Sequence, residues 1–263
     1  YSNIIIKKMI KIGIIGNGFV GKATQILKCQ DIHIQVYDKE ITLCNPLGTT
    51  LDDIIKCDII FISVPTPMNK DGSCYLNIVE SVVNDINDKI DLNNSFVVLR
   101  STIPVGITDK LNCYFMPEFL TEKNYENDFK DNKDWIFGIK NTDQDIIFKE
   151  KIDRLINLAY KNNRINYNNI HYISNSEAEM IKLFRNNFLS VKVSFCNEIY
   201  EFCKLKNIDY ENVRSLAVLD NRIGDSHTQV PGHDGKFGYG GTCFPKDTNS
   251  LRYEIKKEGM KSY

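Results

Sequence analysis

Short apolar runs alternate with amphipathic segments over the first two thirds of the chain. The runs are rich in Ile, Val and Phe and have the length of buried strands, whereas the segments between them have the three- and four-residue spacing of helices. We expect strands at 10–15, 32–37, 58–64, 95–100, 113–116, 135–139 and 170–173, helices at 22–29, 50–56, 76–89 and 144–160, and a polar exposed loop at 124–133. The alternation predicts an α/β fold, a Rossmann-type doubly wound parallel sheet.

Beyond residue 174 the pattern changes to helices alone. Ser174 and Glu177 have the spacing of a capping box, and a long helix is expected over 177–205, followed by helices at 210–219 and 246–258. The apolar stripe of the long helix predicts core or a dimer interface; it consists of Ile181, Phe184, Phe188, Val191, Phe195, Ile199 and Phe202. We therefore expect a Rossmann domain at 9–173 and an all-α domain with one long central helix at 174–263, and set residues 1–8 aside.

A glycine-rich turn joins the first expected strand to the first helix, and Asp38 follows the second strand. The glycines would let a pyrophosphate approach the helix N-terminus, and the acid would hold the ribose hydroxyls and repel a 2′-phosphate. The arrangement predicts binding of NAD rather than NADP, although a glycine turn in another βαβ unit, such as that of a methyltransferase, is the alternative. The predicted cofactor-binding residues of the turn are Gly16, Asn17, Gly18, Phe19, Val20 and Gly21.

A second glycine-rich stretch, K-F-G-Y-G-G-T-C-F-P-K-D at 236–247, leads into the last predicted helix. Pro245 suits the first turn of a helix, so Cys243 is expected at or just before the helix N-terminus, where backbone N–H groups and the helix dipole favour a thiolate. Asp247 falls in the first turn of that helix. Glycines, an activated thiol and a carboxylate together predict a nucleophilic site over a bound substrate; an inert cysteine in a glycine loop is the alternative.

The composition narrows the class of function. A net charge of −1 gives no sign of a nucleic-acid or anionic-membrane partner. No apolar run is long enough to span a bilayer, and no secretory signal is recognisable. The eight cysteines lack C-x-x-C spacing and there are four histidines, which fits reduced thiols in a cytoplasmic protein better than a disulfide frame or a metal site.

Seven ordered motifs resemble the UDP-glucose 6-dehydrogenase family. They are G-N-G-F-V-G, V-P-T-P, S-T-I-P-V-G, P-E-F-L-T-E, E-A-E-M-I-K-L-F-R-N, N-R-I-G and F-G-Y-G-G-T-C-F-P-K-D, and they cover most of residues 9–250. The resemblance implies NAD-dependent oxidation of UDP-glucose to UDP-glucuronate at C6, by two hydride transfers and a cysteine thioester. It also implies a homodimer built on the long helix. GDP-mannose or another nucleotide sugar is the alternative substrate, because GDP-mannose dehydrogenases share most of the pattern.

Catalytic roles follow from the same resemblance. Cys243 would carry the thioester, while Lys182, Asn186 and a water bound by Asp247 would stabilise the oxyanions. Glu118 would be the base for the hydrolytic water. From the residues alone, Lys182 and Asn186 share one helix face, and two solvated polar residues are the alternative reading.

Further contacts are also implied by the resemblance. Thr102 would help to position water, and Arg222 would enter the neighbouring subunit's site. Additional cofactor contacts are implied for Val64, Pro65, Thr66, Ser101, Thr102, Glu122 and Lys246. Substrate contacts are implied for Glu118, Phe119, Leu120, Glu122, Lys182, Asn186, Arg222, Tyr239 and Gly240.

The sequence departs from the family pattern in three places. Only nineteen residues separate Asp38 from Asp58, where the family usually has more. Residues 108–112 leave almost no room for the helix expected there, and family members continue into a third domain, whereas this sequence ends at Tyr263. We therefore keep a second interpretation, a catalytically impaired NAD-binding module. The 263-residue chain is expected to bind NAD and to dimerise through 177–205. It is also expected to bind its nucleotide sugar weakly and to turn over slowly or not at all.

Overall fold

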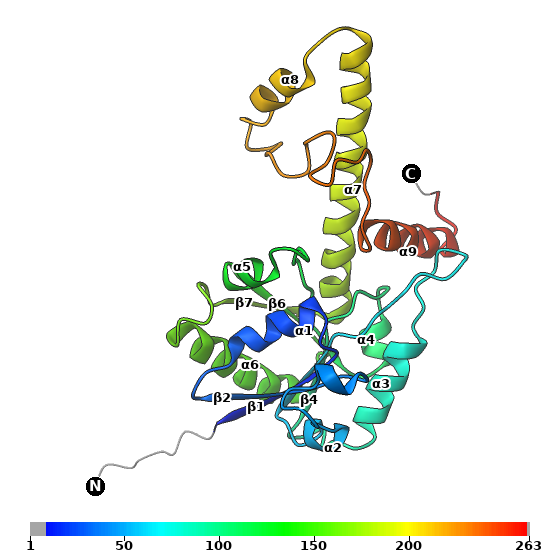
Figure 1. Cartoon of the computed structure of the whole chain (residues 1–263). Helices are drawn as coiled ribbons and strands as arrows, with labels where there is room; N and C mark the ends of the chain where they lie inside the picture. The colour runs from blue at the N-terminus through cyan, green and yellow to red at the C-terminus, as the bar shows by residue number, and fades with distance from the viewer. Residues whose placement is uncertain (1–8, 262–263) are drawn as a thin grey trace. The chain divides into compact units, whose positions relative to one another are not determined.

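The computed structural model of the chain describes residues 9–261 (Figure 1). Two compact units are present. The first contains the described residues up to Thr66 together with Tyr75–Lys182, and the second contains Pro67–Cys74 and the chain from Leu183 onward. The domain boundary at 174 stays a prediction. No helix within residues 9–261 is both long and apolar enough to cross a membrane.

The first unit is built on one seven-stranded sheet in the order β2-β1-β3-β4-β5-β6-β7. All neighbouring strands pair in parallel except β5 and β6, which pair antiparallel at Phe115 and Gly138. The predicted Rossmann-type α/β fold is confirmed, with one antiparallel pair that the prediction did not include. The strands are β1 (Ile10–Ile15), β2 (Ile32–Tyr37), β3 (Ile59–Ile62), β4 (Phe96–Leu99), β5 (Tyr114–Phe115), β6 (Asp134–Ile139) and β7 (Asn169–Ser174).

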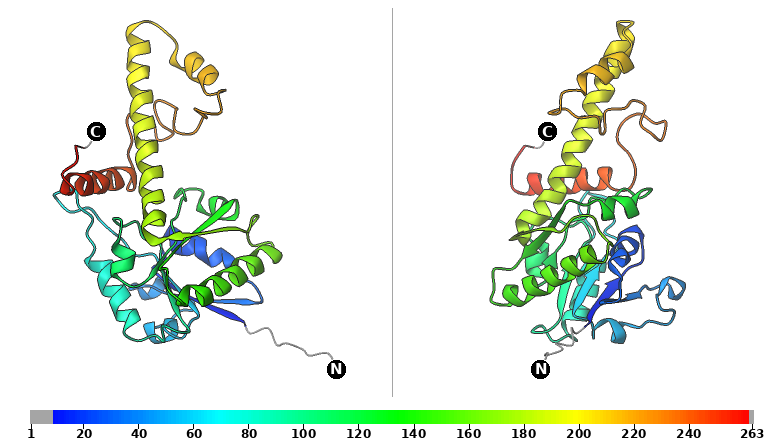
Figure 2. Two further views of the ribbon diagram at one scale, coloured as in Figure 1. Left: turned by 180° about the vertical axis from the view of Figure 1, so that it is seen from behind. Right: turned by 90° about the vertical axis from the view of Figure 1, so that its left-hand side faces the viewer.

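Helices cover both faces of the sheet, as the views in Figure 2 show. On one face α1 (Phe19–Thr24), α5 (Tyr125–Lys130) and α6 (Gln144–Lys161) pack over a core that includes Phe61, Phe137 and Phe148. On the other face α2 (Leu51–Ile54), α3 (Asn77–Asn87) and α4 (Ile107–Lys110) pack over a second core. Burial of the sheet on both faces explains why its central strands are continuous apolar runs rather than alternating ones.

Two predictions about helices were wrong in detail. The polar stretch 124–133 is not a loop throughout, because α5 buries Phe129 against the edge of Trp135, with ring centroids 5.0 Å apart. The first helix was predicted at 22–29 but begins at Phe19 and ends at Thr24, and a 3₁₀ turn, η1 (Gln25–Leu27), follows it. The glycine-rich turn itself thus supplies the start of the helix, which the low helix propensity of glycine hid.

The second unit consists of helices and loops. The long helix α7 (Asn175–Leu205) begins in the first unit and continues into the second, where α8 (Tyr210–Ala217) and α9 (Phe244–Lys257) follow it. The predicted capping interaction is confirmed, because the Ser174 N–H donates to the Glu177 carboxylate (2.8 Å) and the Glu177 N–H donates to Ser174 Oγ (3.3 Å).

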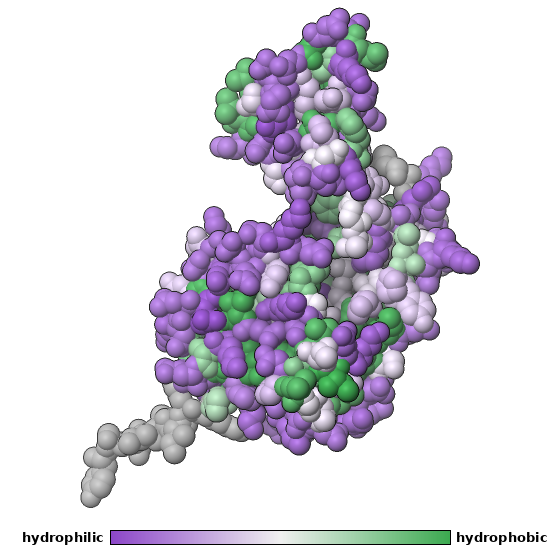
Figure 3. Space-filling model, viewed as in Figure 1, coloured by the Kyte–Doolittle hydropathy of each residue, from purple (hydrophilic) through white to green (hydrophobic). Residues whose placement is uncertain are grey.

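The core of the second unit is small. Cys196 and Cys203 are buried in it with Tyr210 and Val230. Most of the apolar stripe of α7 that lies in the second unit is not buried in this chain. Five of its residues are more than half exposed: Phe184, Phe188, Val191, Phe195 and Phe202. In Figure 3 hydrophobic residues lie among hydrophilic ones on the visible surface of this unit.

Candidate active site

The glycine-rich turn of the first unit has the geometry of a dinucleotide cradle. Gly16 has φ of +92°, and a Cβ there would collide with the backbone carbonyl of Ser63. A Cβ at Gly21 would collide with the carbonyl of Gly16, whereas a Cβ at Gly18 would meet nothing within 4 Å. Gly18 is also the N-cap of α1. Two glycines are therefore required by the packing of the turn, and the third leaves the helix N-terminus open to a ligand.

Asp38 lies beside this turn, directly after β2. One of its carboxylate oxygens accepts from the Asn17 N–H (2.8 Å), and the other accepts from the Glu40 N–H (3.0 Å). The Asn17 side chain donates to the Leu43 carbonyl (2.6 Å). The carboxylate is thus fixed at the end of the strand next to the cradle, where it could accept from ribose hydroxyls. These residues fit a bound dinucleotide.

The loops after β3 and β4 are tied to each other. Ser101 Oγ donates to the Val64 carbonyl (2.7 Å), and Thr66 Oγ1 donates to the Thr102 carbonyl (2.9 Å). Pro65 is exposed between them. Both loops follow the carboxyl ends of parallel strands, the edge at which open α/β sheets bind ligands.

Glu118 and Lys182 form a buried ion pair. Lys182 Nζ lies 2.8 Å from Glu118 Oε1 and donates to the Glu118 carbonyl at 2.7 Å, while the other carboxylate oxygen accepts from the Leu120 N–H (2.9 Å). Burial raises the pKa of Glu118, but the Lys182 charge and these hydrogen bonds together bring that pKa below its ordinary value. Lys182 Nζ also lies 5.7 Å from the centre of the Phe119 ring.

The structure therefore brings together the predicted site residues Glu118 and Lys182, which are 64 positions apart in the sequence. Phe119 and Leu120 are half-buried next to them, while Glu122 is exposed. A role for Glu122 between cofactor and substrate stays a prediction.

In the second unit, Cys243 is the N-cap of α9, and Pro245 lies in the first turn of that helix. The predicted placement of this thiol at a helix N-terminus is confirmed. The cysteine is half-buried, and Thr242 Oγ1 lies 3.8 Å from its sulfur. A partly exposed thiol at the positive end of a helix has the environment of a reactive cysteine.

Asp247 is buried one turn after Cys243 and is fully engaged. Its carboxylate accepts from Asn186 Nδ2 (2.5 Å) and pairs with Lys246 Nζ (2.6 Å). Its own N–H donates to the Cys243 carbonyl (2.9 Å). Two predicted catalytic residues of this unit, Asn186 and Asp247, are thus in direct contact, and Lys246, predicted as a cofactor contact, is bound to the same carboxylate.

The glycine loop that precedes Cys243 is open. Gly238 and Gly241 have φ of +73° and +75°, which favours glycine, and a Cβ at Gly238, Gly240 or Gly241 would meet nothing within 4 Å. The Gly238 N–H donates to Asn197 Oδ1 (2.9 Å). Tyr239 is 38% exposed. The backbone of this loop is therefore accessible to a ligand.

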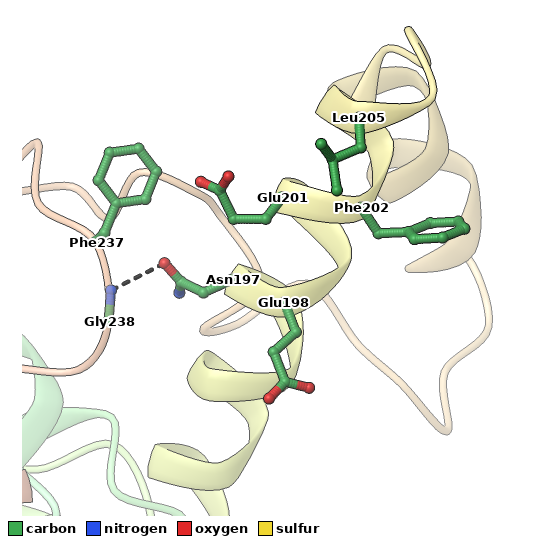
Figure 4. A pocket seen from close by; sticks show the side chains of 7 residues that line it. All are labelled: Asn197, Glu198, Glu201, Phe202, Leu205, Phe237 and Gly238. Atoms are coloured by element: carbon green, nitrogen blue, oxygen red, sulfur yellow. Dashed lines mark hydrogen bonds between the residues drawn. The ribbon is translucent and has the colours of Figure 1, made fainter.

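A shallow groove of about 620 Å³ lies between this loop and α7 (Figure 4). Asn197 and Glu201 point from the helix toward the loop in the figure. The predicted residues Tyr239 and Gly240 do not line it. Its lining consists of Asn197, Glu198, Glu201, Phe202, Leu205, Phe237 and Gly238.

Arg222 is 90% exposed and pairs with Asp220, with Nη2 2.5 Å from Oδ2. Lys192 Nζ donates to the carbonyls of Ile223 (2.8 Å) and Gly224 (2.9 Å), so the loop that carries Arg222 is fastened to α7. Within residues 9–261, the hydrogen bonds and the ion pair of Arg222 are all to Asp220, which is not a predicted site residue.

Sequence reasoning missed one charged residue of the first unit. Arg100 directly follows β4 and is 2% exposed. A single cation at the end of an otherwise apolar strand was the available signal, and it was not used. Within residues 9–261 no cluster of three or more His, Cys, Asp or Glu side chains is arranged to hold a metal ion.

Comparison with known proteins identifies both parts of the chain. Residues 43–156 match the family profile "UDP-glucose/GDP-mannose dehydrogenase family, NAD binding domain", and residues 176–263 match the profile for the central domain of the same family. The glycine-rich turn at 16–21 lies before the first matched range. The two profiles together account for most of the chain.

Individual proteins agree with the profiles. A UDP-glucose 6-dehydrogenase of Bacillus subtilis is 30% identical over 239 residues, which are 85% of this chain and 47% of that protein. A UDP-glucose dehydrogenase structure from Pyrobaculum islandicum has a TM-score of 0.79 at 23% identity, over 99% of this chain and 67% of that one. A UDP-D-ManNAc dehydrogenase structure from Pyrococcus horikoshii has a TM-score of 0.75 at 20% identity, over 97% and 66%. The chain spans about half the length of most curated relatives that it matches.

Proposed function

Because the chain belongs to the UDP-glucose/GDP-mannose dehydrogenase family, we propose that it acts in NAD-dependent oxidation of a nucleotide sugar, UDP-glucose to UDP-glucuronate at C6. The observation that carries the proposal is the thiol of Cys243 at the N-terminus of α9, with the buried Asp247 one turn further on. A cysteine in this position can form a covalent bond to a substrate carbonyl carbon.

The first unit supplies the cofactor site of the proposal. The N-terminus of α1 at Gly18 would face the pyrophosphate, and Asp38 would accept from the adenosine ribose. The loops that carry Thr66 and Thr102 lie at the same edge of the sheet and would border the nicotinamide end. NAD bound there would accept one hydride in each of two successive oxidations.

The second unit supplies the nucleophile. The first oxidation turns the C6 alcohol into an aldehyde, with the hydroxyl proton going to a base. The Cys243 sulfur then bonds to C6, and the aldehyde oxygen becomes an oxyanion that donors such as Lys182 and the Asn186 amide would stabilise. Loss of the second hydride leaves a thioester. Splitting the oxidation in this way avoids the direct oxidation of a hydrated aldehyde.

Hydrolysis completes the proposed cycle. Water adds to the thioester carbon, the bond between C6 and sulfur breaks, and the thiolate of Cys243 leaves as the carboxylate forms. Glu118 is the proposed acceptor for the proton of that water. Its low pKa beside Lys182 means that the carboxylate is ionised near neutral pH and can accept a proton without first losing one.

A second copy of the chain is the proposed protein partner. The exposed apolar stripe of α7 offers a continuous helical face for a homodimer, and Arg222 is exposed on a fastened loop from which it could reach a neighbouring subunit. A helix that leaves several large apolar side chains in water gains stability when another surface covers them.

The proposal is tested by mixing the protein at substrate-level concentration with NAD and UDP-glucose, and by following the absorbance of the reduced nicotinamide. GDP-mannose and UDP-N-acetylmannosamine serve as competing substrates. With UDP-glucose we expect two equivalents of reduced cofactor per sugar consumed. Cys243→Ala should form no more than one equivalent. Reduction with GDP-mannose alone would reassign the substrate. No reduction with any nucleotide sugar, by protein that binds NAD, would contradict the proposed function.

A further inference from the structure

Arg100 is a fully enclosed cation with few partners. It is 2% exposed, its Nη1 donates to Thr24 Oγ1 of α1, and its guanidinium lies 5.6 Å from the centre of the Phe129 ring. Its Nε has no hydrogen-bond partner, and within residues 9–261 it forms no ion pair within 4.0 Å. Burying a guanidinium costs free energy unless a nearby negative charge compensates it. An anion close to Arg100 is therefore expected.

The strand pairing brings Arg100 toward Glu118. Leu99 of β4 pairs with Phe115 of β5, and the Met116 N–H donates to the Leu99 carbonyl (2.9 Å). Arg100 therefore emerges beside Met116. Glu118 follows Met116 by two residues in the segment that continues from β5, so the strand register places the backbone of Glu118 close to the end of β4, where Arg100 lies. Both side chains are buried in the first unit.

We propose that Arg100 is a positioning residue that keeps the buried Glu118 carboxylate ionised, acting as a second cation beside Lys182. The charged groups that face Glu118 are then Lys182 of α7 and Arg100 at the end of β4. The Asp128 carboxylate of α5 accepts from the Thr121 N–H instead (2.7 Å). Two cations around one carboxylate leave the cluster with a net positive charge.

The shifts of the two groups agree with this arrangement. Burial raises the pKa of Glu118, the Lys182 charge lowers it, and the Arg100 charge lowers it further. Burial lowers the pKa of Arg100 to about 10, and Glu118 opposes that change. Each group therefore stabilises the charged form of the other.

Arg100 also connects Glu118 to the helix of the glycine-rich turn. Thr24 Oγ1, which accepts from Arg100, donates to the Val20 carbonyl in the first turn of α1 (2.9 Å). The Arg100 side chain is therefore held by Thr24 of α1 and lies against the Phe129 ring of α5, which restricts its movement. This anchoring distinguishes Arg100 from a surface cation, whose charge would be screened by water.

The test is a pH titration of Glu118 itself, which needs neither substrate nor cofactor. In protein labelled with ¹³C-glutamate, the Glu118 carboxyl resonance is identified by its loss in Glu118→Gln. In Arg100→Met we expect the titration midpoint to rise by about one pH unit or more, since a nearby opposite charge shifts a carboxyl by about 1–3. Arg100→Lys keeps the charge and should stay close to the unaltered chain. Lys151→Met removes a cation that pairs with Asp58 instead and serves as the control.

An unchanged midpoint in folded Arg100→Met would overturn the proposal. If that variant does not fold, the reciprocal measurement decides, because a coupling between two sites is the same from either side. The guanidinium carbon of Arg100 is titrated in the unaltered chain and in Glu118→Gln, and its midpoint should fall in the variant; an equal midpoint would overturn the proposal. The role of Arg100 for the proposed base rests on the proposed function. If Arg100 and Glu118 shift each other's titration midpoint but the chain reduces no NAD, the proposed function is contradicted and the role of Arg100 beside Glu118 is not.

Discussion

Two buried carboxylates, Glu118 and Asp247, each have a lysine ammonium within 2.8 Å. Removing a carboxylate from water costs several kcal/mol, and a close cation with further hydrogen bonds is what offsets that cost. Glu118 receives the Leu120 N–H, and Asp247 receives the Asn186 amide, so each of them is also hydrogen-bonded. Both are candidates for the proposed chemistry, which explains why the chain keeps charge in places that an apolar residue would fill at lower cost.

Glu118 should make the stability of the first unit depend on pH. Its folded pKa lies below its ordinary value, so its stabilising contribution is complete above that value and is lost as the pH falls through the folded pKa. Below about pH 4.3, the ordinary value, we expect stability to fall with a slope of up to about 1.4 kcal/mol per pH unit from this group. Urea unfolding followed by Trp135 fluorescence reports on this unit, because Trp135 is the chain's one tryptophan and is buried there.

Glu118→Gln provides the comparison for this pH dependence. The amide cannot titrate, so the variant should be less stable at neutral pH by about 3–5 kcal/mol and should lose stability less steeply on acidification. Equal slopes for the two proteins below about pH 4.3 would show that Glu118 is not held in its ionised form.

Cys243 should be the most reactive thiol of the described chain. It is half-buried at the N-terminus of α9, whereas Cys196 and Cys203 are buried in the core of the second unit. We expect iodoacetamide to label Cys243 faster than the buried Cys196 and Cys203, by a factor of about ten or more, because buried structural thiols are inert. Peptide mass spectrometry at short times measures this. Uniform labelling of all eight cysteines would remove the basis for its proposed role.

The positions of single residues could be predicted from the sequence where local chain geometry determines them. Pro245 and the helical pattern after it placed Cys243 at a helix N-terminus, and the structure has it there. The ion pair of Glu118 with Lys182 joins residues far apart in the sequence, so no spacing could have predicted it. Arg100 was missed because its partners, Thr24 and Phe129, come from helices whose packing on the sheet only the structure shows.

Among the elements, strands were predicted more reliably than short helices. The strands at 10–15 and 32–37 are confirmed at those residues. The first is a nearly continuous buried run, whereas in the second the buried Ile32, Ile34 and Val36 alternate with partly exposed residues. Helix α5 was missed because only Tyr125 and Phe129 interrupt its polar sequence, and one buried aromatic ring is enough to anchor it once the sheet exists. Tertiary burial thus overrode a weak local pattern.

The stripe on α7 should control association. Phe184 and Phe188 are exposed one turn apart, with stacked rings whose centroids are 6.2 Å apart. Phe188→Asp places a charge in that stripe and should shift the protein toward monomer, with a dissociation constant raised by about a hundredfold, which is about 2.7 kcal/mol for a lost buried aromatic contact. Sedimentation equilibrium measures the association. Lys204→Asp, at an exposed polar position of the same helix, should leave it unchanged; equal masses for both variants would contradict a dimer through this stripe.

For the whole molecule, the two matched domains belong to one family while the chain spans about half the length of most curated relatives. Binding of NAD can be measured on this chain, although the chain is shorter than these relatives. Its sheet, glycine-rich turn and Asp38 all lie in the first unit.

Calorimetric titration should show tighter binding of NAD than of NADP. The Asp38 carboxylate is fixed beside the cradle and would repel a 2′-phosphate, so we expect a preference of at least about tenfold, or about 1.4 kcal/mol. Asp38→Asn keeps the shape of the side chain and removes its charge, so it should reduce the preference for NAD over NADP. Equal affinities of the unaltered chain for both dinucleotides would refute the assignment of Asp38.

The central claim is that Cys243 bonds to the oxidised C6 of a nucleotide sugar. Protein mixed with NAD and UDP-glucose is quenched in acid and digested, and the peptide that carries Cys243 is weighed by mass spectrometry. We predict a mass increase on that peptide equal to the nucleotide-sugar acyl group, dependent on NAD, larger in Glu118→Gln because hydrolysis is slowed, and absent in Cys243→Ala. Formation of two equivalents of reduced NAD per sugar with no adduct on Cys243, in the unaltered chain or in Glu118→Gln, would contradict the account.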